Sequence, residues 1–233
     1  MACLYTRQGI VVNSWGNLMD AVVVDIDDTI VSTDRRRHAA WCKVLGREIP
    51  FQSVESSSSE EILRQYAASD RKIWKRFWML ILCVDESGID LLELHEPIPH
   101  AVEILKKWSR TSKLIYLTAR TENMRQLTLH ELRKFGYPTN DTELKMFTLD
   151  DWMDYSSISS VVKTRSMIFA EILERCNVIR VVDDYPGFFV AYRNYSVPDR
   201  IGLLREKRFT HEQYLSNGAT RVIEGWDELA DVG

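Results

Sequence analysis

The sequence predicts an α/β fold in which a parallel sheet carries helices on both faces. Three short apolar runs, at residues 21–24, 113–117 and 178–182, are typical of strands buried on both faces. Segments with helical apolar spacing lie between these runs, as in parallel sheets covered by helices. Each run ends in polar residues, where open α/β sheets place ligands. The expected architecture is therefore Rossmann-like, with three layers.

Residues 32–96 interrupt this alternation and predict a small helical cap inserted after the first strand. Apolar residues between positions 73 and 82 recur at helical spacing and give a wide apolar face. Pro97 restricts the chain on both sides and marks the return to the main sheet. We therefore expect a core domain of residues 1–31 and 97–233, with the helical cap at 32–96.

The first predicted strand runs directly into the acidic segment Asp25-Ile26-Asp27-Asp28-Thr29. Three carboxylates within four positions repel one another, so the arrangement needs a compensating positive charge. A bound divalent cation would supply it, and hard oxygen ligands suit Mg²⁺. The alternative interpretation is an ordinary acidic turn after a strand. The last of the three runs also ends in two carboxylates, Asp183 and Asp184.

Composition limits the classes of function. The chain has 233 residues and an apolar fraction of 45%, which is enough for a real core and excludes wholesale disorder. The net charge of −4 gives no case for broad nucleic-acid binding, so nucleic acid is expected only as a substrate. The four cysteines form no C-x-x-C pair, which favours a reducing compartment. Without a secretion signal or a membrane-spanning run, we expect a cytoplasmic protein.

Polar residues at strand ends and helix starts together suit phosphoryl transfer to an aspartate. This reaction needs a metal to shield the nucleophile, donors for the phosphoryl oxygens, a cation that keeps the nucleophile ionised and an acid for the leaving oxygen. Asp25 can be the nucleophile and Asp27 the acid. Thr118 supplies a hydroxyl donor and Lys163 an ammonium group. Asp183 and Asp184 would complete the metal site.

The order of these motifs resembles that of the haloacid dehalogenase superfamily. Residues 24–29 match its D-x-D-x-T signature, Thr118 its second motif, Lys163 its third and the double aspartate its fourth. The resemblance spans residues 21–204. It implies the Rossmann-like core of that superfamily and an aspartyl-phosphate intermediate on Asp25.

The resemblance also implies the roles of the site residues. Asp27 would be the general acid/base, and the cofactor would be Mg²⁺. The implied metal ligands are Asp25, the backbone carbonyl of Asp27, Asp183 and Asp184. The residues expected to bind the substrate are Thr118, Ala119, Arg120 and Lys163. A small phosphorylated substrate is expected, because a cap over the site leaves little room for a protein.

Several residue assignments have alternatives. Lys145 competes with Lys163 as the phosphate-binding lysine, and Lys163 is favoured because it opens the helix before the last acidic strand. Arg120 is as well explained by a surface ion pair. The basic cluster Arg35-Arg36-Arg37-His38 could hold an anionic substrate, although a solvated helix start is the preferred interpretation.

The reaction itself also has alternatives. Dehalogenases of the superfamily lack the second aspartate, so Asp27 favours phosphoryl transfer to water. The same residues could serve a phosphomutase, which must exclude water by closing its cap. The segment at 161–184 also looks like the phosphatase domain of polynucleotide kinase 3′-phosphatases, which makes a nucleic-acid end another candidate substrate. A non-catalytic module that binds a phosphorylated ligand is the candidate from a different class.

Overall fold

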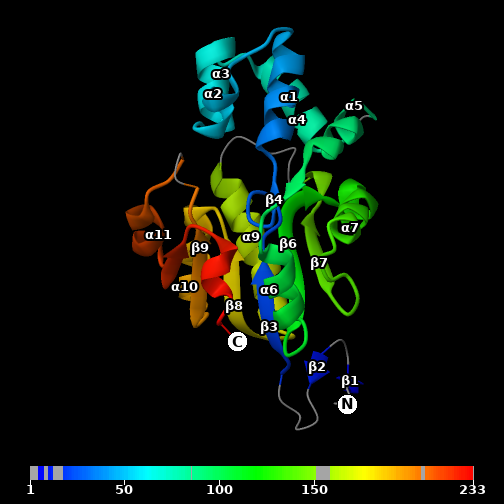
Figure 1. The fold of residues 1–233 in the computed structure, drawn as a ribbon, viewed down its shortest axis with the longest axis vertical. Coiled ribbons are helices and arrows are strands. Elements are labelled where there is room, and N and C mark those ends of the chain that lie inside the picture. The colour runs from blue at the N-terminus through cyan, green and yellow to red at the C-terminus, as the bar shows by residue number, and fades with distance from the viewer. Residues whose placement is uncertain are drawn as a thin grey trace.

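A six-stranded sheet forms the centre of the protein in this computed structural model, which describes residues 5–7, 10–12, 18–84, 86–150, 158–205 and 208–232. All its strand pairs are parallel, in the order β10-β9-β8-β3-β6-β7. These strands are β3 (Asp20–Val24), β6 (Lys113–Thr121), β7 (Glu143–Phe147), β8 (Asn177–Asp183), β9 (Asp199–Leu203) and β10 (Arg221–Ile223). Helices cover both faces of the sheet, so the predicted three-layer α/β fold is confirmed (Figure 1).

Strand β3 lies inside the sheet because both of its faces are apolar. Val22 and Val24 point into one core cluster, whereas Ala21 and Val23 point into another, and none is more than 1% exposed. The first face is covered by α6 (Ala101–Trp108), α7 (Arg125–Lys134) and η4 (Trp226–Leu229). The second face is covered by α9 (Ile158–Leu173), α10 (Phe189–Asn194) and α11 (His211–Asn217).

The order of the strands reverses between β3 and β8. From β3 the chain builds outward through β6 and β7, then returns to the other side of β3 and builds outward through β8, β9 and β10. Val24 pairs with Val182, so the next residues, Asp25 and Asp183, meet at the carboxyl edge of the sheet. The amide of Asp25 donates to the Val182 carbonyl at 3.0 Å. This is the topological switch point at which open α/β sheets bind ligands.

A separate group of helices lies beyond the carboxyl edge of the sheet (Figure 1). Its own apolar core includes Trp41 and Phe77, whose rings stack with centroids 4.1 Å apart. The group consists of α1 (Asp34–Leu45), α2 (Phe51–Glu55), α3 (Ser59–Ala67), α4 (Arg71–Ile81), α5 (Glu86–Ile89) and η1 (Asp90–Leu94). We call it the cap.

Two short antiparallel strands, β4 (Val31–Ser32) and β5 (Glu96–Pro97), join the cap to the core. The domain division at residues 32 and 96 remains a prediction, which the position of this strand pair supports. The remaining short elements are β1 (Tyr5–Arg7), β2 (Ile10–Val12), η2 (Glu122–Met124) and η3 (Pro186–Phe188). Among the described residues, none of the helices combines the length and the apolar character needed to cross a bilayer.

Candidate active site

A tight turn follows β3 and keeps its carboxylates at the edge of the sheet. The carbonyl of Ile26 accepts hydrogen bonds from the amides of Thr29, Ile30 and Val31 at 3.3, 2.9 and 3.0 Å. Asp28 adopts a φ of 62°, in the left-handed region that aspartate tolerates better than most residues. The chain therefore doubles back at once into β4 and the cap.

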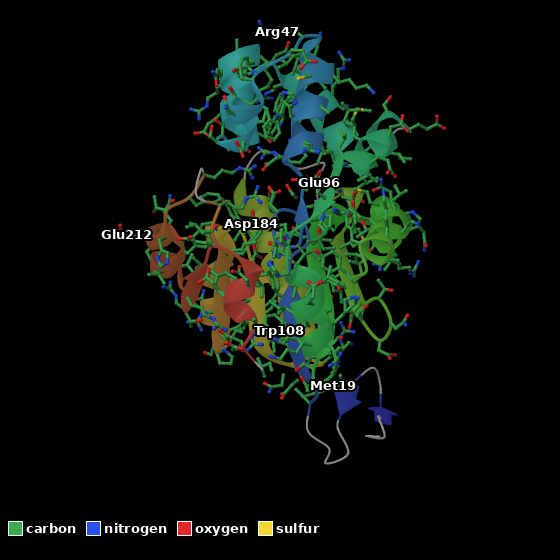
Figure 2. All side chains as sticks on the ribbon, viewed as in Figure 1. Met19, Arg47, Glu96, Trp108, Asp184 and Glu212 are labelled. Carbon is green, nitrogen blue, oxygen red and sulfur yellow. The ribbon has the colours of Figure 1, made fainter. Side chains whose placement is uncertain are left out.

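Asp25, Asp183 and Asp184 form a compact carboxylate cluster. One carboxylate oxygen from each residue lies within 4.8 Å of the other two. Asp25 is 6% exposed and Asp183 is completely buried. The hydroxyl of Thr29 donates to Asp25 at 3.2 Å and also reaches Asp184 at 3.5 Å. Figure 2 shows Asp184 where the core faces the cap.

This cluster is short of positive charge. Burial raises the pKa of Asp25 to about 8, with Arg165 opposing the rise and Asp183 adding to it. Burial likewise raises the pKa of Asp183, and burial together with the Asp28 and Asp25 carboxylates raises the pKa of Asp184. A divalent cation would offset this repulsion, and three clustered carboxylates are the hard oxygen donors that Mg²⁺ prefers. The residues present therefore fit the predicted metal.

A buried arginine of α9, Arg165, is the cation that contacts this cluster. Its Nη1 donates to Asp25 Oδ1 at 2.9 Å and its Nη2 donates to Asp183 Oδ2 at 2.6 Å. Its Nε donates to the Tyr192 hydroxyl at 2.9 Å, and that hydroxyl donates to Asp183 at 2.9 Å. The guanidinium also lies over the Phe188 ring, 4.3 Å from its centroid. Three hydrogen-bonded groups and one aromatic ring therefore hold the Arg165 guanidinium in contact with the carboxylates.

The predicted lysine, Lys163, lies on the same helix but is exposed to solvent. Positions two apart on a helix differ in direction by about 200°, so Lys163 and Arg165 point to opposite sides. Lys145 lies on the edge strand β7 and pairs there with a glutamate of the same strand at 3.1 Å. A sequence pattern that could have pointed to Arg165 is the spacing of Val161, Arg165 and Phe169 at every fourth residue, which places all three on one buried face of the helix. An arginine on a buried face requires a buried partner.

Asp27 points to a different set of groups and is held by Arg120. The Nε of Arg120 donates to both Asp27 oxygens at 3.1 and 3.0 Å, and its Nη2 donates to Oδ1 at 2.8 Å. Its Nη1 donates to the Thr128 hydroxyl at 3.2 Å and to Glu131 at 2.6 Å. Glu131 in turn lies 2.5 Å from Nδ1 of His95. Arg120, which is 3% exposed, is therefore committed to protein carboxylates and is not a surface ion pair.

Thr118 and Ala119 lie toward the carboxyl end of β6, which is paired directly with β3. The side chain of Thr118 is completely buried, and its hydroxyl accepts a hydrogen bond from the Arg120 amide at 3.2 Å. Ala119 is half-buried and lines a cavity beside Asp27. Both residues therefore lie at the same edge of the sheet as Asp25.

A further group of charges joins the turn after β3 to the cap. Arg208 donates to Asp28 Oδ2 at 2.8 Å and also to Asp34, the first residue of α1. Arg205 donates to Asp34 at 2.6 Å, and Arg37 donates to it at 3.3 Å. Burial would raise the pKa of Asp28, but Arg205 and Arg208 hold it well below its usual range. The carboxylates of this group are therefore matched by cations.

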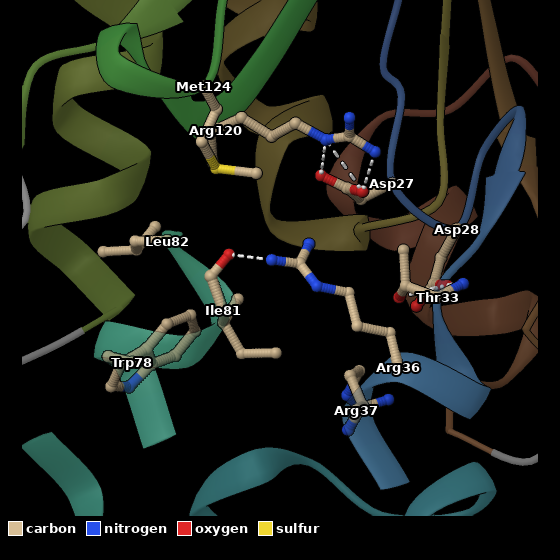
Figure 3. A pocket seen from close by; sticks show the side chains of 11 residues that line it. Asp27, Asp28, Thr33, Arg36, Arg37, Trp78, Ile81, Leu82, Arg120 and Met124 are labelled. Carbon is tan, nitrogen blue, oxygen red and sulfur yellow. Dashed lines mark hydrogen bonds and ion pairs between the residues drawn. The ribbon is translucent and has the colours of Figure 1, made fainter. Parts of the chain in front are cut away.

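A cavity of about 220 Å³ lies between the cap and the core, next to Asp27 (Figure 3). It is lined from the core by the turn after β3 and the end of β6, and from the cap by α1 and the end of α4. The lining residues are Asp27, Asp28, Thr33, Arg36, Arg37, Trp78, Ile81, Leu82, Ala119, Arg120 and Met124. Any molecule in this cavity would be covered by the cap.

Solved structures of the haloacid dehalogenase superfamily share this fold. A haloacid dehalogenase-like hydrolase from Streptococcus pneumoniae has a TM-score of 0.62 and 14% identity, covering 91% of this chain and 96% of its own. A protein from Clostridium acetobutylicum described as a predicted phosphatase has a TM-score of 0.63 and 13% identity, covering 91% and 97%. A β-phosphoglucomutase from Clostridium difficile has a TM-score of 0.57 and 15% identity, covering 92% and 94%.

At these identities the likeness concerns the fold, and the chain has the fold of haloacid dehalogenase superfamily hydrolases and mutases. No family model matches the sequence, and no curated protein matches it. The resemblance predicted from the four motifs is therefore confirmed for the architecture of the chain.

Proposed function

We propose that this protein is a Mg²⁺-dependent phosphomonoesterase that acts through an aspartyl-phosphate on Asp25. The observation that carries the proposal is the cluster of Asp25, Asp183 and Asp184 against Arg165 at the switch point of the sheet. A buried nucleophile with two further carboxylates and a fixed cation suits attack on a phosphate ester. The fold neighbours include phosphatases, which agrees with this reaction class.

In the first half of the reaction, an oxygen of Asp25 attacks the phosphorus atom. The bond between phosphorus and the ester oxygen breaks, and Asp27 gives its proton to that leaving oxygen. Arg165 keeps the Asp25 carboxylate in a single orientation through the 2.9 Å hydrogen bond to Oδ1. Mg²⁺ held by Asp25, Asp183, Asp184 and the Asp27 carbonyl would reduce the repulsion between the carboxylate and the phosphoryl group.

In the second half, water attacks the phosphorus atom of the aspartyl-phosphate. Asp27, now a carboxylate, takes a proton from that water, and the bond between phosphorus and Asp25 breaks to release inorganic phosphate. Arg120 holds Asp27 through three contacts of 2.8 to 3.1 Å, so the same carboxyl group stays in place for both proton transfers. The Thr118 hydroxyl and the Ala119 backbone, at the neighbouring strand end, are proposed to bind the phosphoryl oxygens.

In this proposal, Arg165 takes the cationic role that was predicted for Lys163. Arg165 touches the proposed nucleophile, whereas Lys163 is exposed. Arg120 likewise changes role. Its proposed function is to position Asp27 and not to bind the substrate directly.

Two alternative reactions use the same residues. A phosphomutase would return the phosphoryl group to an organic acceptor under the closed cap, and a mutase is among the fold neighbours. A nucleic-acid 3′-phosphatase would need room for a nucleoside, which is larger than the cavity of about 220 Å³ between the cap and the core. Analysis of the organic products separates the first alternative, because only hydrolysis releases free phosphate.

The direct test is release of phosphate from 4-nitrophenyl phosphate by wild type and by Asp25→Asn. We expect Mg²⁺-dependent turnover that EDTA abolishes, and a fall of at least about a thousandfold in kcat for Asp25→Asn. Asp20→Asn is the matched control, because Asp20 is exposed at the opposite end of the same strand. Turnover that survives EDTA, or an Asp25→Asn variant as active as Asp20→Asn, would remove the basis of the proposal.

A further inference from the structure

Arg36 is a buried cation that forms no ion pair within the described part of the chain. It is 2% exposed, and its hydrogen bonds to described residues run from Nη2 to the carbonyls of Leu80 and Ile81 and to the sulfur of Cys83. Its Nε is buried and has no hydrogen-bond partner among the residues that the structure describes. Burial accordingly lowers the pKa of Arg36. An unpaired buried charge is unfavourable, so such a group is typical of a place where an anion binds.

The guanidinium of Arg36 faces the cavity beside Asp27. Figure 3 shows it between the Ile81 carbonyl and the pair formed by Asp27 and Arg120. Arg35, one residue earlier, points instead to solvent and pairs with Glu96 at 2.8 Å. Of the three arginines in the basic cluster, Arg35 is therefore exposed, whereas Arg36 and Arg37 line the cavity. Arg37 already pairs with Asp34 at 3.3 Å, which leaves Arg36 as the candidate to bind an anion there.

The leaving group of the proposed reaction must lie on this side of the site. Asp27 gives its proton to the leaving oxygen, and Asp27 lines the cavity, whereas Asp25 does not. The rest of the molecule attached to that oxygen therefore extends into the space in front of Arg36. Trp78, Ile81 and Met124 provide apolar walls around that space.

We propose that Arg36 binds an anionic group on the leaving part of the substrate, so that the substrate is a small phosphomonoester with a second negative charge. This inference rests on the proposed phosphatase function and names its substrate class. A carboxylate or a second phosphate would accept hydrogen bonds from the free guanidinium nitrogens.

The size of the cavity limits the rest of the substrate. A cavity of about 150 Å³ accepts benzene, so about 220 Å³ accommodates a leaving group of roughly nine non-hydrogen atoms. The leaving parts of phosphorylated three- and four-carbon acids are of this size, and that of a three-carbon bisphosphate is slightly larger. Nucleosides are larger still.

The test compares substrates that differ only in the second charge. Glycerol 3-phosphate, 3-phosphoglycerate and 2,3-bisphosphoglycerate carry a hydroxymethyl, a carboxylate and a carboxylate with a phosphate. We expect wild type to prefer at least one of the two acids over glycerol 3-phosphate by at least about tenfold in kcat/KM. Arg36→Met should lower that ratio by a similar factor. The two acids distinguish carboxylate recognition from recognition of a second phosphate.

Arg76→Met is the matched control, since Arg76 is an exposed arginine of the cap on α4 and should leave the ratio unchanged. If Arg36→Met does not fold, as judged by circular dichroism, Arg36→Gln decides, because it can still donate to the Leu80 and Ile81 carbonyls without the charge. A wild-type ratio near one, or a ratio that the Arg36 variants leave unchanged, would overturn the inference while leaving the phosphatase function intact.

A binding measurement makes the inference independent of turnover. Calorimetric titration of Asp25→Asn with 3-phosphoglycerate and 2,3-bisphosphoglycerate should give at least one dissociation constant that rises at least about tenfold when Arg36→Met is added. Should no substrate release phosphate, this titration still decides about Arg36. Equal affinities with and without Arg36 for both acids would then overturn the proposal.

Discussion

The two sides of the site, one around Asp25 and the other around Asp27, differ in charge. On the first side, three carboxylates have oxygens within 4.8 Å of one another, and the guanidinium of Arg165 pairs with two of them, Asp25 and Asp183. On the second, Asp27 and Glu131 share Arg120, and Arg36 adds a cation that forms no ion pair with any described residue. One side is therefore short of positive charge, and the other is not.

This difference indicates what each side binds. A surplus of buried carboxylates favours binding of a cation, whereas a buried guanidinium that pairs with no carboxylate favours binding of an anion. The metal and the phosphoryl group would then lie near Asp25, and the charged leaving part of the substrate near Arg36. The proposed metal cation and the proposed anionic group of the substrate would therefore bind on opposite sides of the reaction centre.

The largest expected effect is the loss of Arg165, which would break the charge arrangement on the Asp25 side. Arg165→Met removes the donor to Asp25 Oδ1 and the ion pairs of Asp25 and Asp183 with this guanidinium. We expect kcat/KM for 4-nitrophenyl phosphate to fall at least about hundredfold, as when a donor in an active site is deleted. Steady-state kinetics at saturating Mg²⁺ measures this.

Lys163→Met is the matched control for Arg165→Met, because it changes an exposed lysine on the same helix. We expect its kcat/KM to stay within about twofold of wild type. A fall in kcat/KM for Lys163→Met and none for Arg165→Met would instead assign the cationic role to Lys163, as the motif order predicts.

The proposal of Arg165 in place of Lys163 shows how much of the candidate site the sequence could predict. The fold, the acidic strand ends and their order follow from local patterns, because a buried strand and the residues after it are contiguous in sequence. Which side chain of a helix faces those strand ends depends on the rotation of the helix. A shift of two residues changes that direction by about 200°. The motif order placed the helix correctly, and the burial of Val161 and Phe169 identifies its inner face.

The contacts of Arg120 and Arg36 could not be predicted from the sequence for a different reason. Their roles depend on partners far away in the chain, such as Glu131 for Arg120 and the carbonyls of Leu80 and Ile81 for Arg36. An arginine next to a strand end or at a helix start has the same local pattern whether it is solvated or buried. Only the tertiary contacts decide between these states.

The second prediction concerns stability on the Asp27 side of the site, where Glu131 pairs with Arg120. Burial would raise the pKa of Glu131, but Arg120 and His95 lower it to about 2, below the usual value of 4.5. A carboxyl whose pKa is lowered by folding stabilises the protein above pH 4.5, and this contribution is lost as the pH falls from 4.5 towards 2. The shift corresponds to about 3 kcal/mol at pH 7 and to roughly half of that at pH 3.

Urea unfolding of Glu131→Gln and wild type at several pH values measures this contribution. The difference in unfolding free energy should shrink by roughly half between pH 7 and pH 3. Glu171→Gln, an exposed position on α9, should show no such trend. A difference that is constant with pH would mean that Glu131 acts through packing, and the Asp27 side would not be an electrostatically paired network.

The smallest effect is expected where the charges are already matched, at the contact of Arg208 with Asp28 and Asp34. Arg208 also donates to the Glu55 carbonyl at 3.3 Å, so it joins the turn after β3 to two helices of the cap. Arg208→Gln should loosen the cap and raise KM about three- to tenfold, with kcat within about twofold of wild type, because no reacting atom is touched. Arg221→Gln, which alters a comparable ion pair with Asp199 within the core, should leave KM unchanged. A fall in kcat as large as that expected for Arg165→Met would place Arg208 at the reacting atoms. The contrast between the charge-matched group around Arg208 and the charge-deficient cluster around Asp25 would then be wrong.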